Sequence, residues 1–267
     1  MNIRILLLIS MIITMTAAGQ VGAATVTRDV SYRHADTELQ GYLAYDDTVK
    51  GLRPGILIVH EWWGLNDYAR RRAEQLATMG YVAFAVDMYG KGKVTRHPEK
   101  AGEWSKTITQ NTAFWQKRIN TGLAVLRQQP QTDTSRIAAI GYCFGGGTVQ
   151  QLAYSGADID GVVSFHGALL KPPAMAAKIV KAKFLICHGA ADSLNPLEKV
   201  KAYLASMEAA ALDYQFVAYG GARHSFTNPA ADKANLPMLA YSPSADRRSW
   251  QHMKMFFEEL WGAAPSP

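Results

Sequence analysis

The chain has 267 residues, of which 48% are hydrophobic and 19% are charged. This length suits one large domain or two small ones, and the composition supports a sizeable core and excludes a disordered or collagen-like chain. Two cysteines are too few for a disulfide scaffold. The net charge is +6, but the densest basic run, Arg70 to Arg72, is typical of a solvated helix face. No longer block of Lys and Arg occurs, so we expect no nucleic-acid partner.

The first 24 residues differ from the rest of the chain. Arg4 is their only charge, residues 5–18 are apolar apart from Ser and Thr, and Val21-Gly22-Ala23 fits a small-x-small cleavage site. The apolar run is shorter than the roughly 20 residues of a membrane span. We therefore expect a signal peptide over 1–24, cleaved near Ala23 or Ala24. The mature protein would be secreted or periplasmic, free of the membrane, and a single domain over 25–267.

Short apolar runs alternate with segments of helical period, which predicts an α/β fold with a mostly parallel sheet between helices. Eight strands are expected, the first two as an antiparallel pair: 26–32, 39–45, 56–60, 81–87, 137–142, 161–165, 184–188 and 214–219. Helices are expected near 67–79, 110–128, 146–155, 196–210 and 245–260. The stretches 90–110 and 226–244 are too long for simple connections, so both are candidate site-forming loops.

One motif carries most of the functional information. Gly141-Tyr-Cys143-Phe-Gly-Gly146 follows a buried strand and precedes a helix, which is the pattern of a nucleophile elbow. The sharp turn strains the backbone at the nucleophile, and glycines flank it where side chains would clash with the neighbouring strand and helix. A helix N-terminus under the thiol favours the thiolate. The alternative interpretation is a buried packing cysteine beside a glycine-rich helix start.

An acid and a histidine follow later strands in the order that such a fold requires. Asp192 comes after the strand 184–188, and His224 comes after the strand 214–219. The three side chains can then act as nucleophile, orienting carboxylate and general base. A lone Asp or His in a turn is more often a cap or a surface group, but the coincidence of both with the elbow favours a Cys-His-Asp triad.

The other histidines lie on polar or helical stretches or at strand ends, where a crowded, hydrogen-bonded histidine is the simpler interpretation. His60-Glu61-Trp-Trp-Gly64 only superficially suggests the zinc motif HExxH, because position 64 is Gly. A strand end also cannot place two ligands one helical turn apart. We therefore expect no metal site.

Glu61 ends a strand just before the segment that supplies an oxyanion-hole amide in these folds, so its carboxylate would face the thiol. The alternative is that the carboxylate anchors its own loop through the amides of Trp63 and Gly64. The natural oxyanion donors are the backbone amides of Trp62 and Phe144, because they follow this strand and the nucleophile.

Five segments together resemble the dienelactone hydrolases, over roughly residues 30 to 260. They are Glu61-Trp-Trp-Gly-Leu-Asn66, Asp87-Met-Tyr89, Gly141-Tyr-Cys-Phe-Gly-Gly146, Gly189-Ala-Ala-Asp192 and Gly221-Ala-Arg-His-Ser-Phe226. The resemblance implies an α/β-hydrolase fold without a large lid, no cofactor, and a triad of Cys143, Asp192 and His224. It also implies that Glu61 contacts the resting thiol and assists its deprotonation.

The resemblance also implies two arginines that hold a substrate carboxylate. At the matching positions this chain has Lys91 and Asn228, which puts a carboxylate-bearing lactone in doubt. In the family's strand order, 161–165 lies between the strands of Cys143 and Cys187. Two inter-strand spacings of ~4.8 Å exceed the roughly 7 Å limit between Cα atoms of a disulfide, so the cysteines should not pair.

We expect a hydrolase that acts on a small ester, lactone or thioester through an acyl-enzyme. The substrate is a small molecule, and we expect the protein to be a monomer. The alternatives are an acyltransferase of the same fold or a non-catalytic binding protein. The residues expected at the pocket, some of which core packing would explain equally well, are Trp62, Trp63, Tyr89, Lys91, Trp104, Phe226 and Asn228.

Overall fold

The computed structural model describes residues 25–262, so the predicted signal peptide and its cleavage site lie outside the described residues. One eight-stranded sheet organises these residues, in the order β1-β2-β4-β3-β5-β6-β7-β8. The strands are β1 (Thr25–His34), β2 (Thr37–Asp46), β3 (Arg53–Val59), β4 (Val82–Val86), β5 (Thr132–Tyr142), β6 (Gly161–Phe165), β7 (Lys183–Gly189) and β8 (Tyr214–Tyr219). From β4 to β8 all neighbours are parallel, whereas β2 is antiparallel to β1 and β4. This is the predicted α/β-hydrolase fold.

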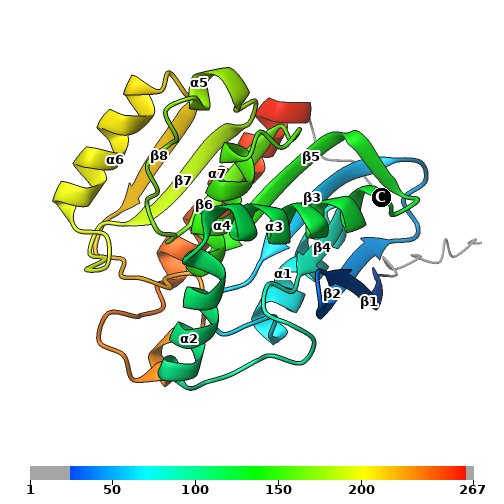
Figure 1. The fold of residues 1–267 in the computed structure, drawn as a ribbon, viewed down its shortest axis with the longest axis horizontal. Coiled ribbons are helices and arrows are strands. Elements are labelled where there is room, and N and C mark those ends of the chain that lie inside the picture. The colour runs from blue at the N-terminus through cyan, green and yellow to red at the C-terminus, as the bar shows by residue number, and fades with distance from the viewer. Residues whose placement is uncertain (1–24, 263–267) are drawn as a thin grey trace, which may run out of the picture.

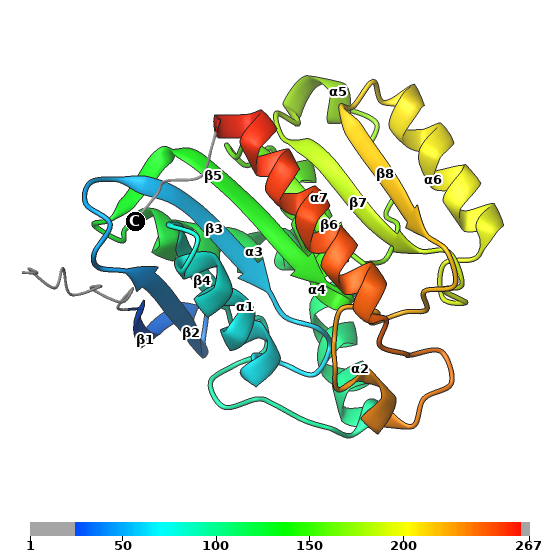
Figure 2. The ribbon, with the colours of Figure 1, turned by 180° about the vertical axis from the view of Figure 1, so that it is seen from behind.

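Helices cover both faces of the sheet. They are α1 (Asp67–Ala77), α2 (Pro98–Thr109), α3 (Thr112–Arg127), α4 (Phe144–Tyr154), the short α5 (Ala176–Ile179), α6 (Leu197–Ala209) and α7 (Pro243–Trp261), with a 3-10 turn at Ala231–Ala234. Figure 1 shows α3, α4 and α6 in front of the sheet, and Figure 2 shows α1 and α7 on the opposite face. Within residues 25–262, no helix is both long and apolar enough to span a bilayer.

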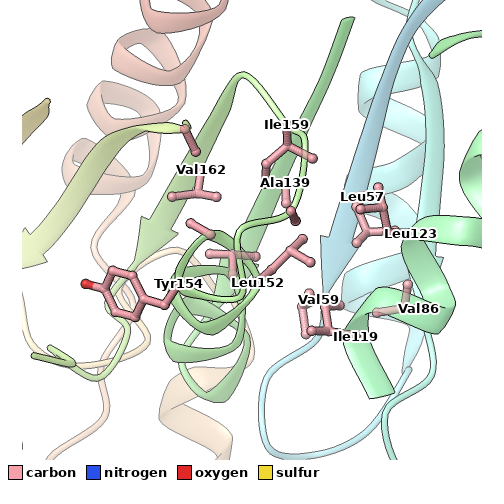
Figure 3. Close-up of a cluster of buried hydrophobic side chains, with 14 of the residues drawn as sticks. Leu57, Val59, Val86, Ile119, Leu123, Ala139, Leu152, Tyr154, Ile159 and Val162 are labelled. Atoms are coloured by element: carbon pink, nitrogen blue, oxygen red, sulfur yellow. The ribbon is translucent and has the colours of Figure 1, made fainter. Parts of the chain in front are cut away.

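Successive side chains of the central strands point to opposite faces of the sheet, so a separate hydrophobic core forms on each face. In β3, Leu57 and Val59 pack with α3 and α4, while Ile56 and Ile58 pack with α1 and α7. All four side chains are fully buried. Figure 3 shows the first of these clusters, in which Ile119 and Leu152 approach the strand residues from α3 and α4. A strand buried on both faces requires the continuous apolar run that marked it in the sequence.

Two features differ from the prediction. The stretch 90–110, expected as a loop, contains helix α2, which begins with Pro98 at its first turn and buries only Ala101 and Ile108. Arg72 does not lie on a solvated face, because consecutive helix residues point about 100° apart and cannot share one. Its side chain is 8% exposed and pairs with Asp246 of α7.

Candidate active site

Cys143 lies at the turn between β5 and α4. Its backbone angles, φ 54° and ψ −113°, fall where residues other than glycine are strained. The thiol is partly exposed, and it stands at the N-terminus of α4, whose unpaired amides favour a negative charge. This is the strained strand-to-helix turn that the motif predicted.

Two glycines make the turn sterically possible. A Cβ atom on Gly141 would lie 2.0 Å from the carbonyl oxygen of Gly145, and one on Gly145 would lie 2.2 Å from that of Val59. Backbone atoms of a helix and a central strand cannot move aside, so both positions require glycine. The clashes with helix and strand are those expected from the sequence.

His224 and Asp192 meet at the ends of β8 and β7. His224 Nδ1 lies 2.8 Å from Asp192 Oδ2, and both side chains are buried. The carboxylate fixes Nδ1 as the protonated nitrogen, which leaves Nε2 free; this atom is buried and has no partner among the described residues. Burial alone would lower the pKa of His224, but Cys143 and Asp192 outweigh it and raise the pKa to about 10.

Asp192 is held in its charged form. Burial favours the neutral carboxyl, but hydrogen bonds from His224 and Asn195 lower its pKa to about 2. Asn195 Nδ2 lies 3.1 Å from the same carboxylate oxygen that His224 contacts. The charged, buried carboxylate can therefore orient His224 and stabilise an imidazolium there.

Cys143 and His224 line one cavity of about 370 Å³. Its walls are mainly apolar and are formed by Trp62, Trp115, Phe144, Gly147, Ala168, Leu194, Leu236, Met238 and Leu239. Its polar lining consists of Ser105, Thr109, Asn195 and Lys199. Both stretches flagged as site-forming, 90–110 and 226–244, contribute to this wall. An apolar cavity beside a thiol and an imidazole is suited to a small organic substrate.

The backbone amides of Trp62 and Phe144 are free to bind a ligand. Within residues 25–262, neither N–H donates to a protein acceptor. Both residues line the cavity that contains Cys143. Unpaired amides beside a nucleophile are the usual donors to a developing oxyanion.

The Glu61 carboxylate is engaged by the loop that follows His224. Its oxygens accept hydrogen bonds from Ser225 Oγ at 2.8 Å and Asn228 Nδ2 at 2.6 Å. Burial raises the pKa of Glu61, and these two bonds oppose the rise. The side chain therefore fastens the loop 225–228, whereas the alternative drawn from the sequence had it bind the amides of Trp63 and Gly64.

Comparison with known proteins agrees with this geometry. The family model of the dienelactone hydrolase family matches residues 39–261. The chain belongs to the dienelactone hydrolase family. Members of this family hydrolyse ester and lactone bonds, so the chain is a hydrolase of this class.

Three relatives illustrate the range of similarity within the family. A crystal structure described as a dienelactone hydrolase-like promiscuous phosphotriesterase from metagenomic libraries is 38% identical. It covers 90% of this chain and 99% of its own, with a TM-score of 0.86. Protein usf of Aquifex pyrophilus is 25% identical over 86% of this chain and 97% of its own length. A protein of Aquifex aeolicus with the provisional name carboxymethylenebutenolidase is 24% identical over 86% of this chain and 96% of its own length.

At the two positions where dienelactone hydrolases are expected to carry arginine, this chain has residues that bind glutamates outside the cavity. Lys91 lies on the surface, 2.8 Å from Glu38, with about half of its side chain exposed. Asn228 is bound to Glu61. Neither residue lines the cavity beside Cys143, so neither offers a cation to a substrate there.

Of the aromatic residues expected at the pocket, Trp62 lines the cavity and the others lie outside its wall. Trp63 packs in a small cluster with Ala101 and Leu239. Tyr89 packs against Phe144, with 5.3 Å between the ring centroids, and against Trp104, with 5.8 Å between them. Phe226 is fully buried and packs against the rings of His166 and Tyr219.

Several wall residues had no sequence signal. Trp115 and Met238 are ordinary apolar residues of a helix and a loop, and only tertiary packing brings them beside Cys143. Asn195 had a weak signal, since an amide three residues after the predicted triad aspartate can bond to it. Among the described residues, no group of three or more His, Cys, Asp and Glu side chains could hold a metal ion.

Proposed function

We propose that this dienelactone hydrolase relative cleaves small neutral esters, lactones or thioesters through an acyl-enzyme on Cys143. The Cys143 thiol passes its proton to His224 Nε2 and its sulfur attacks the substrate carbonyl carbon. The amides of Trp62 and Phe144 bind the resulting oxyanion. The intermediate then expels the alcohol or thiol, which takes the proton from His224. Water, deprotonated by His224, hydrolyses the thioester and returns the free thiol.

One observation carries this proposal. His224 and Cys143 line the same cavity, and the buried Nε2 of His224 has no hydrogen-bond partner among the described residues, while Asp192 holds the opposite nitrogen at 2.8 Å. A buried nitrogen without a partner is costly. It is best explained as the atom that exchanges a proton with Cys143 and the substrate.

The preference for a neutral substrate rests on the lack of an arginine in the described lining of the cavity. Lys91 and Asn228 offer no charge to it, and Lys199 is the one Lys or Arg side chain in its described lining. Lysine binds a carboxylate as a flexible point charge without the paired hydrogen bonds of arginine. A substrate carboxylate beside the scissile bond would therefore be desolvated among apolar walls with little compensation.

The nucleophile is tested with p-nitrophenyl acetate and a matched pair of cysteine variants. Cys143→Ala should abolish turnover, because the attacking sulfur is lost. Cys187→Ala removes a fully buried thiol on β7 and should retain most of the activity. Full activity in Cys143→Ala would contradict the proposal, and binding without turnover in the wild type would favour a non-catalytic binding protein.

The substrate preference is tested with a neutral lactone and a carboxylate-bearing lactone of similar size. We expect the neutral compound to have the higher kcat/KM at both low and high salt. A preference for the carboxylate that weakens with salt would contradict a neutral pocket and would point to Lys199 as the anchor. Adding an alcohol acceptor to the same assay separates hydrolysis from acyl transfer.

Neutral phosphotriesters are a second substrate class for the same site. The 38% identical relative is described as a promiscuous phosphotriesterase, and the apolar walls of this cavity suit an uncharged triester. In this reaction the Cys143 sulfur attacks phosphorus and p-nitrophenol leaves with the proton held by His224. Paraoxon should release p-nitrophenol with the wild type and not with Cys143→Ala. Equal release by both proteins would contradict this activity.

We also propose that residues 1–24 are removed on export and that the mature protein works as a monomer outside the cytoplasm. The composition of these residues supports export. Mass spectrometry of the protein recovered from the periplasm or medium should give a chain that begins near Ala24 or Thr25. An intact chain in the cytoplasm would contradict export, and a dimer on sedimentation would contradict the monomer.

A further inference from the structure

A buried chain of hydrogen bonds runs from Cys143 to the loop that carries His224. The backbone N–H of Cys143 donates to Nδ1 of His166 at 3.1 Å and shares this hydrogen with the carbonyl of Phe165 at 3.0 Å. Nε2 of His166 lies 2.7 Å from Thr227 Oγ1. His166 and Thr227 are 0% and 1% exposed, so water does not compete for these bonds.

The direction of the bonds follows from chemistry. A backbone N–H can only donate, so Nδ1 of His166 carries no proton, and in a neutral ring Nε2 must then carry it. Nε2–H therefore donates to the Thr227 hydroxyl. Burial and the neighbouring His224 both hold the pKa of His166 well below its ordinary value, which keeps the ring neutral.

Thr227 is itself held from three sides. Its hydroxyl also bonds to Tyr68 Oη at 2.6 Å, and its carbonyl accepts from Arg72 Nη2 at 3.0 Å. Both partners lie on α1, and Arg72 is fixed in turn by Asp246 of α7. The hydroxyl that meets His166 thus has a defined position set by two helices.

We infer that Thr227 and His166 form a positioning relay that sets the backbone of Cys143 relative to His224. This inference rests on the proposed role of Cys143 as nucleophile. The relay joins two strained points: Cys143 has φ 54° and His166 has φ 41°, conformations that persist only when surrounding bonds hold them. It also places an uncharged ring 5.3 Å from the ring of His224. A charged ring there would repel an imidazolium on His224.

The relay is tested with two substitutions of Thr227. Thr227→Val keeps the shape of the side chain and removes the hydroxyl, so His166 Nε2–H loses its acceptor. Thr227→Ser keeps the hydroxyl. We expect Thr227→Val to slow alkylation of Cys143 by iodoacetamide about tenfold and to lower kcat by a similar factor. KM should stay unchanged, because Thr227 does not line the cavity. Thr227→Ser should remain within about twofold of the wild type.

Equal alkylation rates in the wild type and in folded Thr227→Val would overturn the relay. Alkylation reports on the thiol without requiring turnover, so the relay and the proposed hydrolysis can fail separately. A second measurement covers the case in which Thr227→Val does not fold. Nitrogen-15 spectra of the wild-type histidine rings should show His166 protonated at Nε2 and bare at Nδ1 at neutral pH. A proton on Nδ1, or a charged ring, would contradict the inference.

Discussion

Asp192 is a buried residue of this site that stays charged. Its pKa falls from an ordinary value of 3.8 to about 2 although burial opposes the fall, since His224 and Asn195 bond to the charged form. A group whose pKa is lowered on folding contributes stability at every pH above its unfolded value. That contribution is lost as the pH falls through the folded value.

We therefore expect the wild type to lose about 2 kcal/mol of unfolding free energy through Asp192 between roughly pH 4 and pH 2. The measurement is urea denaturation across this range for the wild type and for Asp192→Asn, which cannot titrate. Other carboxylates affect both proteins equally, so the difference between the two curves isolates Asp192. Parallel curves would contradict the lowered pKa.

For Glu61 we expect a different effect, because its two carboxylate oxygens accept hydrogen bonds from Ser225 and Asn228. Glu61→Gln leaves one acceptor oxygen in place of two and removes the charge, so either the bond to the Ser225 hydroxyl reverses its direction or one of the two bonds is lost. We expect a loss of about 1–3 kcal/mol in unfolding free energy and a measurable residual kcat/KM. His224→Ala should reduce kcat/KM by several orders of magnitude. Equal loss in the two variants would mean that Glu61 takes part in the chemistry directly.

At the scale of elements, two neighbouring arginines of α1 have opposite roles. Arg72 is buried and ties α1 to Asp246 of α7, while Arg71 is exposed. Arg72→Ala leaves Asp246 without its ion-pair partner and should cost about 3–5 kcal/mol. Arg71→Ala should change the unfolding free energy by less than about 0.5 kcal/mol. Urea denaturation of both variants checks this contrast, and similar losses of unfolding free energy would contradict a stabilising Arg72–Asp246 ion pair.

Glycines of two helices provide a second matched pair. A Cβ on Gly145 of α4 would lie 2.2 Å from the Val59 carbonyl oxygen, whereas a Cβ on Gly102 of α2 would have no atom of residues 25–262 within 4 Å. Gly145→Ala should lower the unfolding free energy by at least about 1–3 kcal/mol. Gly102→Ala should raise it by about 0.5–1 kcal/mol, because alanine favours a helix. Thermal unfolding distinguishes the two, and a stable Gly145→Ala would contradict the close approach at the elbow.

The helices and strands differ in how well the sequence predicts them. The strands and most helices were predictable because each has a local signal, such as the apolar run of β3 or the glycines around Cys143. Helix α2 was missed because it buries only Ala101 and Ile108, which is too little for a clear helical period. Arg72 was misplaced because its partner Asp246 is 174 residues away in the chain.

On the scale of the whole molecule, the sheet brings the end of every central strand to one edge. Cys143, Asp192 and His224 follow β5, β7 and β8, and the order β5-β6-β7 separates the two free cysteines as predicted. The approach of the three side chains was predictable because parallel strands end together. The cavity walls and the hydrogen bond between His166 and Thr227 could not be predicted from the sequence, since they depend on how distant loops pack over that edge.

In the proposed reaction, Cys143 carries the acyl group during turnover. The most direct measurement is mass spectrometry of protein quenched in acid shortly after mixing with p-nitrophenyl acetate, followed by peptide mapping. We predict one acetyl group on the peptide that contains Cys143, and none on that peptide in Cys143→Ala. An acetyl group found on another residue, or rapid turnover by Cys143→Ala, would contradict the role of Cys143 as the nucleophile.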